Sequence, residues 1–538
     1  MNMNLKNQLK YSIAICSIMS YCCFFNSCTS EFRDMNTNDY GVTDDMLNYD
    51  NLKVGGFITT MQRDVIPTDA AAGDYQEAQN LAGDIFAGYM GAINDKFVAN
   101  NFYDLNHQVR WKDRAFKVAF EKVMPAWKMV SEKAEKNSIE YALSLVLKVA
   151  AMHRLADYYG PLPYNEFGKG LITTPYDAMD VVYETFFKEL NEAIAIIEDF
   201  VAKTPEAHPL KNYDLVYGGD FTKWLKFANS LKLRLAMHTV YVDKDKAKQY
   251  AKEAVTSGVM ETVEDNAQLA SANGLTVYNP LKKIWYDYSD TRMGANMQSF
   301  LTGYDDARIS SYFRLSTFKE KKNGYFGVRN GVNINAKNNY LPLSVPNIEA
   351  ENPVRWMCVS EVYFLRAEGA LRGWVKEMKG NAKDLYETGI QLSFKDWGAT
   401  MRADYLTNES KIPAEFIDQV GGNDIKKGDP SLSTITIPWK ESDGFEKNLE
   451  RIITQKWIAM FPDGQEAWTE FRRTDYPKVF PVIVNNSGNT IDTDLQIRRM
   501  TFPQSEYDNN TVEVTKAISL LGGPDTGGTK LWWDKKER

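Results

Sequence analysis

The class of fold is decided by residues 139–156, which read Ile139-Glu140-Tyr141-Ala142-Leu143-Ser144-Leu145-Val146-Leu147-Lys148-Val149-Ala150-Ala151-Met152-His153-Arg154-Leu155-Ala156. The polar residues Glu140, Ser144 and Lys148 recur at helical spacing, so they form one narrow stripe. Almost everything else in the run is apolar. A helix that is apolar on nearly every side lies inside a protein, so other helices have to surround it. The sequence that follows, Gly160-Pro161-Leu162-Pro163, ends the helix.

Helical spacing of apolar residues continues on both sides of this run. It predicts helices over residues 74–91, 113–136, 138–159, 176–200, 221–241, 243–257, 359–371, 382–397, 402–420 and 446–472. Consecutive pairs occupy roughly 35–45 residues, which is the period of tetratricopeptide-like repeats. The prediction is therefore a mostly α fold, a tetratricopeptide-like scaffold of helix pairs.

Two parts of the chain depart from this period. Residues 259–350 are rich in Asn, Gly, Tyr and Pro, and they predict a large loop-rich insertion with one helix near 291–303 and a few short strands, for example at 325–328. Residues 477–538 predict an irregular C-terminal segment, held to the body by Trp532 and Trp533. Residues 51–538 are expected to form a single domain, because a stacked helical array can exceed the usual size of one core.

The N-terminus has the three parts of a secretory signal. Lys6 and Lys10 precede an apolar run over 11–25, about half the length that spans a bilayer, and Ser27 follows it. The next residue is Cys28, and a cysteine here is typical of a bacterial lipoprotein, whose acylated N-terminus it becomes. We expect a lipoprotein signal peptide over 1–27, lipid on Cys28 and a polar tether over 28–50. The alternative is an ordinary signal peptide cut elsewhere.

Composition excludes some classes of function. The net charge is −8 and no basic patch stands out, so the sequence predicts no nucleic-acid partner. Without the signal, Cys358 is the one cysteine besides Cys28, so no internal disulfide can form. No stretch after the signal is long and apolar enough to span a membrane. Aromatic residues make up 13%, which suits both a large core and a surface that stacks on sugars.

Catalytic signatures are scarce. The four histidines form no H-E-x-x-H pair, and neither a G-x-S-x-G elbow nor a P-loop occurs. The D-x-D starts at Asp243 and Asp492 lack the rest of a calcium loop and are interpreted as turns, so we predict no metal site and no cofactor. Among 71 acidic residues, a carboxylate pair of the glycoside hydrolase kind stays open, because sequence does not give the separation between two carboxylates.

Several ordered motifs resemble the SusD/RagB family of nutrient-binding outer-membrane lipoproteins from Bacteroidetes. They are spread over almost the whole mature length and include Asn36-Thr37-Asn38-Asp39-Tyr40, Gly73-Asp74-Tyr75-Gln76, Ala87-Gly88-Tyr89, Asp157-Tyr158-Tyr159-Gly160-Pro161-Leu162-Pro163-Tyr164, Trp224-Leu225-Lys226-Phe227-Ala228-Asn229-Ser230-Leu231-Lys232-Leu233-Arg234, Glu361-Val362-Tyr363-Phe364-Leu365-Arg366-Ala367-Glu368 and Gln465-Glu466-Ala467-Trp468-Thr469-Glu470-Phe471-Arg472-Arg473-Thr474. No single motif decides the matter; their order and joint presence carry the resemblance.

The resemblance implies a helical, tetratricopeptide-like scaffold at the cell outer membrane that faces the extracellular side. Its implied partner is a SusC-like TonB-dependent β-barrel transporter, over which the lipoprotein acts as a lid. The implied activity is the capture of an oligosaccharide, or in some relatives a peptide, without catalysis. Ligand contacts in the family vary with the cargo, so no site residue transfers by motif.

The candidate site residues therefore come from physical reasoning. A sugar offers a flat C–H face to an aromatic ring and a rim of hydroxyls to polar groups. Two loops supply that mixture, and they nominate Asn100, Asn101, Tyr103 and Trp111 in the first loop and Trp285, Tyr286, Tyr288, Asp290 and Arg292 in the second. The alternative is that these aromatic residues anchor long loops to the body.

Three hypotheses of function remain open. The first is a glycan-binding subunit of an uptake complex, with peptide as a possible cargo in place of glycan. The second is a lipid-anchored glycoside hydrolase on a helical scaffold. The third is a scaffold protein without a ligand.

Overall fold

The computed structural model of the protein describes residues 51–97, 101–105, 109–319 and 323–537. The chain divides into two units, Met1–Lys53 and Val54–Arg538, and nearly all of the described residues belong to the second. The predicted signal peptide, the predicted tether, Cys28 and Asn100 lie outside the described residues.

Helices make up most of the regular structure, as the sequence predicts. The α-helices are α4 (Leu52–Val65), α5 (Gly73–Tyr75), α7 (Val109–Val118), α8 (Met124–Lys133), α9 (Ile139–Tyr159), α10 (Met179–Lys203), α11 (Phe221–His238), α12 (Lys244–Ser257), α13 (Pro280–Lys282), α14 (Ala295–Gly303), α15 (Ile309–Tyr312), α16 (Lys337–Tyr340), α17 (Val359–Leu371), α18 (Ala382–Asp396), α19 (Gly444–Ala459), α20 (Gly464–Thr474), α21 (Gln504–Asn509) and α22 (Thr511–Leu520). Wider π-helical turns are η2 (Gln76–Asp84), η3 (Ala119–Val123) and η5 (Lys283–Asp287), and 3₁₀ turns are η4 (Val263–Asp265) and η6 (Glu441–Asp443).

Helix α9 is interior, as its composition predicts. Every residue from Ile139 to Tyr159 except Glu140 is buried. The Ser138 hydroxyl begins the helix by accepting a hydrogen bond from the Tyr141 N–H, and this satisfies one of the free N–H groups of the first turn. The helix ends at Gly160, whose φ of 96° is a conformation that a side chain disfavours.

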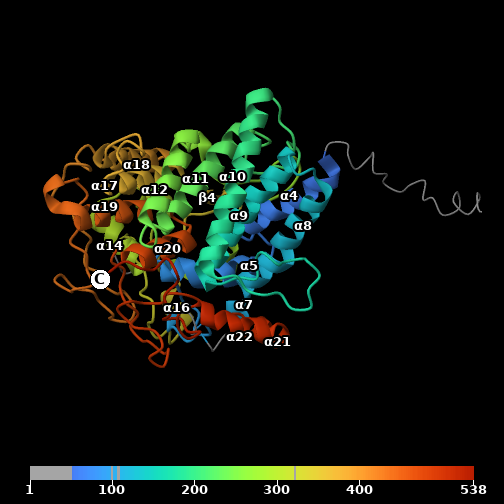
Figure 1. Ribbon diagram of the computed structural model, residues 1–538. Helices are drawn as coiled ribbons and strands as arrows, with labels where there is room; N and C mark the ends of the chain where they lie inside the picture. The colour runs from blue at the N-terminus through green and yellow to red at the C-terminus, as the bar shows by residue number, and fades with distance from the viewer. Residues whose placement is uncertain (1–50, 98–100, 106–108, 320–322, 538) are drawn as a thin grey trace, which may run out of the picture. The chain divides into compact units, whose positions relative to one another are not determined.

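Helix pairs are stacked in sequence order around α9. Helix α10 packs against α9 and α11, and α11 packs against α12. A second group follows later in the chain, in which α17 packs against α18 and α19 (Figure 1). The tetratricopeptide-like arrangement of helix pairs is thereby confirmed. The core between them contains fully buried indoles of Trp224, Trp457, Trp468 and Trp533.

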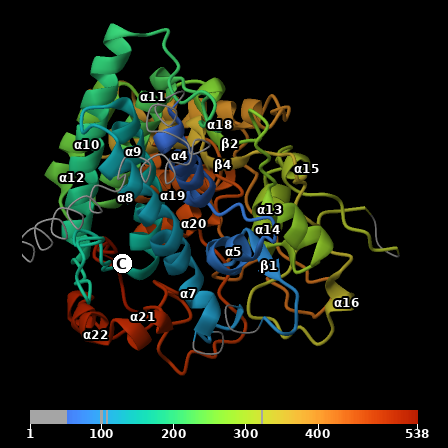
Figure 2. The same ribbon diagram turned by 90° about the vertical axis from the view of Figure 1, so that its right-hand side faces the viewer.

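Two small antiparallel sheets connect the insertion to the helices. Strand β1 (Met90–Ala92) pairs with β3 (Thr291–Met293), so that Met90 lies opposite Met293 and Ala92 opposite Thr291. Strand β2 (Ala267–Leu269) pairs with β4 (Val354–Met357). Figure 2 shows β1 beside α14 of the insertion. The first pair positions the nominated residues, because β1 precedes one nominated loop and β3 ends the other.

One predicted helix is absent and another is divided into two. Residues 402–420 form turns, because Asp404 and Asn408 engage nearby groups of the chain and Pro413 cannot donate a backbone hydrogen bond. The predicted helix over 446–472 is two helices, α19 and α20, which are separated at Pro462.

The irregular regions also differ in detail from the prediction. Residues 325–328 are not a strand; only Val328 forms a bridge, with Gly294. The predicted helix over 74–91 ends earlier, because Met90–Ala92 is extended and belongs to β1. The C-terminal segment is largely irregular, as predicted, but contains α21 and α22. Their short apolar patterns lie between prolines and glycines, which hid them in the sequence.

Candidate binding site

The β1–β3 pair brings the two nominated loops together. The backbone N–H of Ile93 donates to the carbonyl of Asp290 at 2.9 Å, which extends the ladder by one step. The buried Asp290 carboxylate accepts hydrogen bonds from Gln76 Nε2 at 3.0 Å, Asn94 Nδ2 at 3.0 Å and Lys337 Nζ at 2.7 Å. Asp290 therefore joins both loops to a helix and to the end of the insertion.

All three described candidates of the first group are buried, and Trp111 lies in α7 rather than in the predicted loop. Asn101 is buried and donates from Nδ2 to the Ala92 carbonyl at 3.1 Å. Tyr103 is buried and donates its hydroxyl hydrogen to Gln496 Oε1 at 3.2 Å. Trp111 is buried against Phe97, with ring centroids 4.7 Å apart and nearly perpendicular rings. In this arrangement the three side chains hold the loop to the body.

The second loop divides its candidates between the interior and the surface. Trp285 is 6% exposed and donates from Nε1 to the Ile348 carbonyl at 2.8 Å. Tyr286 is 61% exposed, and its ring meets Trp285 edge to face with centroids 5.4 Å apart. Tyr288 is half-buried and donates to the Ala71 carbonyl at 2.6 Å. Tyr286 is thus the nominated aromatic residue with an open face.

Arg292 also lies inside. Its side chain donates to the carbonyls of Thr291, at 2.7 Å, and Leu341, at 3.3 Å. Burial lowers the pKa of the guanidinium to about 10, and the nearby Asp290 carboxylate opposes the shift only in part. The role visible for Arg292 is to hold the insertion beside β3.

Charged side chains that the sequence did not nominate lie beside the neighbouring rings of Trp285 and Tyr286. Lys282 Nζ lies 4.1 Å from the Tyr286 ring centroid and 4.3 Å from that of Trp285. The same ammonium pairs with Glu349 at 2.9 Å, and Glu349 also pairs with Arg314. Lys282, Arg314 and Glu349 are far apart in sequence, so no local pattern could have grouped them. We call Tyr286, Lys282, Arg314 and Glu349 the Tyr286 surface; it offers a ring face with donors and acceptors beside it.

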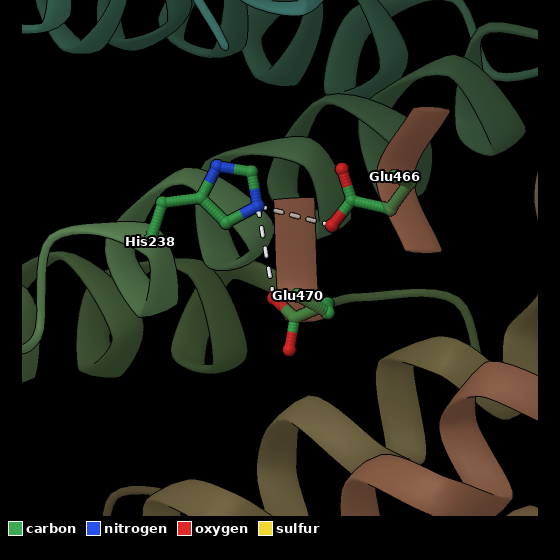
Figure 3. A group of neighbouring side chains, drawn as sticks. All are labelled: His238, Glu466 and Glu470. Carbon is green, nitrogen blue, oxygen red and sulfur yellow. Dashed lines mark hydrogen bonds and ion pairs between the residues drawn. The ribbon is translucent and has the colours of Figure 1, made fainter. Parts of the chain in front are cut away.

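A second cluster has residue types that can bind a metal. His238 on α11 and Glu466 and Glu470 on α20 are buried and direct their polar atoms toward one another (Figure 3). His238 Nε2 lies 3.0 Å from Glu466 Oε1 and 3.9 Å from Glu470 Oε1. The ammonium of Lys456 lies 3.7 Å and 3.4 Å from the same two oxygen atoms. A divalent ion would compete with that ammonium for both oxygens, so the residues present do not fit a metal centre.

The cluster is instead a network of matched buried charges. Five cations face five carboxylates along α9, α11, α17, α19 and α20: Arg234, His238, Arg372, Lys456 and Arg473 against Asp157, Glu361, Glu368, Glu466 and Glu470. Burial by itself lowers the pKa of His238, but the carboxylates of Glu466 and Asp157 outweigh it and raise the pKa to about 9. The imidazole is therefore charged at neutral pH, and the network stabilises the helical core.

Among the residues that the structure describes, no helix is long and apolar enough to cross a membrane.

The comparisons with known proteins agree over nearly the whole chain. The sequence profile of a family described as SusD-like, Susd and RagB outer membrane lipoprotein, matches residues 34–534. A solved SusD homolog from Bacteroides thetaiotaomicron VPI-5482 is 36% identical with a TM-score of 0.83, over 90% of this chain and 99% of its own. A chitin-binding SusD homolog from Flavobacterium johnsoniae is 37% identical with a TM-score of 0.83, over 89% of this chain and 98% of its own.

A third solved structure is similar to the same extent. The SusD homolog from Bacteroides uniformis ATCC 8492 is 38% identical with a TM-score of 0.83, over 90% of this chain and 99% of its own. A search of curated proteins found no match.

Proposed function

Because this chain belongs to the SusD-like family of outer membrane lipoproteins, we propose that it captures an oligosaccharide outside the cell and delivers it to a SusC-like TonB-dependent transporter. The proposal includes lipid on Cys28, a tether over residues 28–50 and a single binding domain over 51–538 that faces the extracellular side. The chitin-binding homolog, which is 37% identical, supports a glycan as cargo.

The observation that carries the proposal is the Tyr286 surface. Tyr286 keeps 61% of its area exposed although Trp285 beside it is packed and hydrogen-bonded, so the exposed ring stands on a fixed support. Lys282 lies over the Tyr286 ring and Arg314 over the Trp285 ring, and both pair with Glu349, so charged donors and acceptors lie beside the two rings. An aromatic face with charged hydrogen-bonding groups at its rim matches the two faces of a sugar ring.

A glycan array followed by calorimetry tests this role. The mature protein is expected to bind at least one oligosaccharide without releasing products. Tyr286→Ala is expected to weaken that binding by a factor of about 2–10, since one aromatic stacking contact is worth about 0.5–1.5 kcal/mol beyond the area it buries. Phe445→Ala is the matched control, because Phe445 is an exposed aromatic at the start of α19 and belongs to no part of the Tyr286 surface. Equal affinity of Tyr286→Ala and the wild type would remove this surface from the site.

The anchor and the partner need separate tests. Labelling with a fatty-acid analogue is expected to mark the wild type and to leave Cys28→Ala unmarked. Affinity purification from the outer membrane is expected to recover a TonB-dependent barrel with the protein. Product formation from a bound glycan would instead favour a hydrolase, and selective binding of peptides would favour peptide as the cargo.

A further inference from the structure

A cavity of about 1010 Å³ lies apart from the Tyr286 surface and shares no residue with it. Its wall is assembled from the insertion, from the loop at 424–431 and from the C-terminal segment, with contributions from Arg329, Asp424, Asp429, Tyr476, Lys478 and Gln496. Gln496 also accepts the hydrogen bond from Tyr103, so the cavity is tied to the first nominated loop.

Arg329 is the unusual group in this wall. Its side chain is buried, with 8% of the residue exposed. Nη2 donates to the Pro481 carbonyl at 2.9 Å and Nη1 donates weakly to the Asn423 carbonyl at 3.4 Å. The Nε–H is buried without an acceptor in the described part of the chain. A guanidinium carries five N–H donors, so this one retains donors that the described protein groups do not use.

Some buried arginines in this chain face a carboxylate, whereas others, such as Arg366 and Arg472, donate to backbone carbonyls as Arg329 does. Arg308 makes a two-pronged pair with Asp306, at 3.0 and 2.6 Å, and Arg498 pairs with Asp534 at 2.6 Å. For Arg329, no ion pair within 4.0 Å is found among the described residues. Burial lowers the pKa of Arg329, and the more distant carboxylates of Asp429 and Asp418 offset this only partly. A buried cation that carbonyl oxygens satisfy only in part, with no carboxylate in contact, is unfavourable, so an arriving carboxylate would offset the cost of its desolvation.

The rest of the wall restricts which anion can enter. Six acidic residues (Asp424, Asp429, Glu446, Asp475, Asp494 and Glu537) outnumber three basic ones (Arg329, Lys478 and Lys536). A simple anion such as sulfate is repelled by this excess of negative charge. A molecule that combines one carboxylate with several hydroxyl or ammonium donors can pair the carboxylate with Arg329 and the donors with the acidic residues of the wall.

We propose that this cavity is a second binding site, in which Arg329 receives the carboxylate of an acidic cargo while the donors of the same molecule face Asp424 and Asp429. This site rests on the proposed function, because it assumes that the protein binds a cargo. It adds the chemical class of that cargo, a molecule with a carboxylate. The carboxylate can come from an acidic sugar or from the C-terminus of a peptide, and both sources share the chemistry that Arg329 recognises.

Calorimetry on the mature chain tests the site with four probes that carry at most one carboxylate: galacturonic acid, its methyl ester, trialanine and trialanine amide. One of the two acids is expected to bind at least tenfold more tightly than its derivative that lacks the carboxylate. Binding of galacturonic acid identifies an acidic sugar as the source, and binding of trialanine identifies a peptide. Equal affinity for acid and neutral forms, or no binding of any probe, would overturn the proposal.

Variants then locate the binding. Arg329→Met is expected to abolish the preference for the acid, Arg329→Lys to retain part of it, and sulfate to compete with neither probe. Tyr286→Ala is expected to leave carboxylate binding unchanged. If Arg329→Met does not fold, the difference in affinity between the acid and neutral probes for the wild type still tests whether the protein selects a carboxylate. If Tyr286→Ala loses binding of a neutral glycan but keeps binding of the carboxylate probe, the two sites are independent, and each proposal can fail without the other.

Discussion

His238 gives the chain a stability that falls as pH rises above neutrality. Its pKa is raised to about 9 in the folded protein, against an ordinary value of 6.5. A raised pKa means that the folded state holds the proton more tightly, so the stabilisation is fully present below pH 6.5 and is lost as pH rises through 9. The shift corresponds to about 3 kcal/mol, of which about 2 kcal/mol is lost between pH 6.5 and 8.5.

The substitution His238→Gln removes the pH-dependent contribution of the imidazolium to the unfolding free energy and keeps an amide that can still form hydrogen bonds. Urea unfolding of both proteins at pH 6.5 and 8.5 gives the difference in unfolding free energy at each pH. That difference is expected to shrink by about 2 kcal/mol between the two values. Comparison with the variant cancels the contribution of Asp84, whose pKa burial raises to about 7.

His153 on α9 is the matched control. It is buried like His238, but burial and the nearby Arg234 lower its pKa to about 4, so it stays neutral throughout this window. His153→Gln is expected to change the unfolding free energy by the same amount at pH 6.5 and 8.5. A difference for His238→Gln that is constant with pH, or a pH-dependent one for His153→Gln, would refute the assignment of charge in the network.

Three further substitutions test the packing and the ionic core. Lys456→Met leaves the carboxylates around it without their ammonium, so the unfolding free energy is expected to fall by about 3–5 kcal/mol. Added Zn²⁺ should raise the melting temperature of this variant but not of the wild type. An equal response of both proteins to Zn²⁺ would contradict the role of Lys456. Gly464→Ala places a Cβ against the backbone of Asp84 at less than van der Waals distance. This overpacking is expected to lower the unfolding free energy by about 3 kcal/mol in urea. Unchanged stability would show that the two backbones can separate freely. Trp224→Phe removes the 2.8 Å hydrogen bond to Asp214 in a fully buried site and is expected to lower unfolding free energy by about 2 kcal/mol; a loss below about 0.5 kcal/mol would argue against that bond.

The helical scaffold could be predicted because its signal is local. Each pair of helices shows its buried face in the spacing of apolar residues, and α9 shows burial on nearly all sides. The false helix over 402–420 has acceptable apolar spacing, but side-chain hydrogen bonds at Asp404 and Asn408 favour turns there. The charge network could not be predicted for another reason. Charged residues at helical spacing indicate a solvated helix face, and only the tertiary structure shows that this face is buried.

The candidate site was harder to predict than the fold. Aromatic composition nominates loops but does not tell which ring faces solvent, and the structure exposes Tyr286 while it buries Trp285 and Trp111. Whether a loop aromatic is an anchor or a platform depends on partners elsewhere in the chain, such as the Ile348 carbonyl that accepts from Trp285. The two loops stay candidates for ligand contact, and Tyr286 is the residue at which calorimetry should begin.

The short ladder between β1 and β3 also bears on how the protein is made. It joins Ala92 to Thr291, and helices α9 to α12 lie between them in the chain. Local helix pairs can form as soon as their residues are available, whereas this pairing must wait for closure of a very long loop. During export the helical stack can therefore assemble first, and the loops that flank the ladder are brought together only after β3 has emerged. A partly exported chain would therefore have packed helices before the two nominated loops meet.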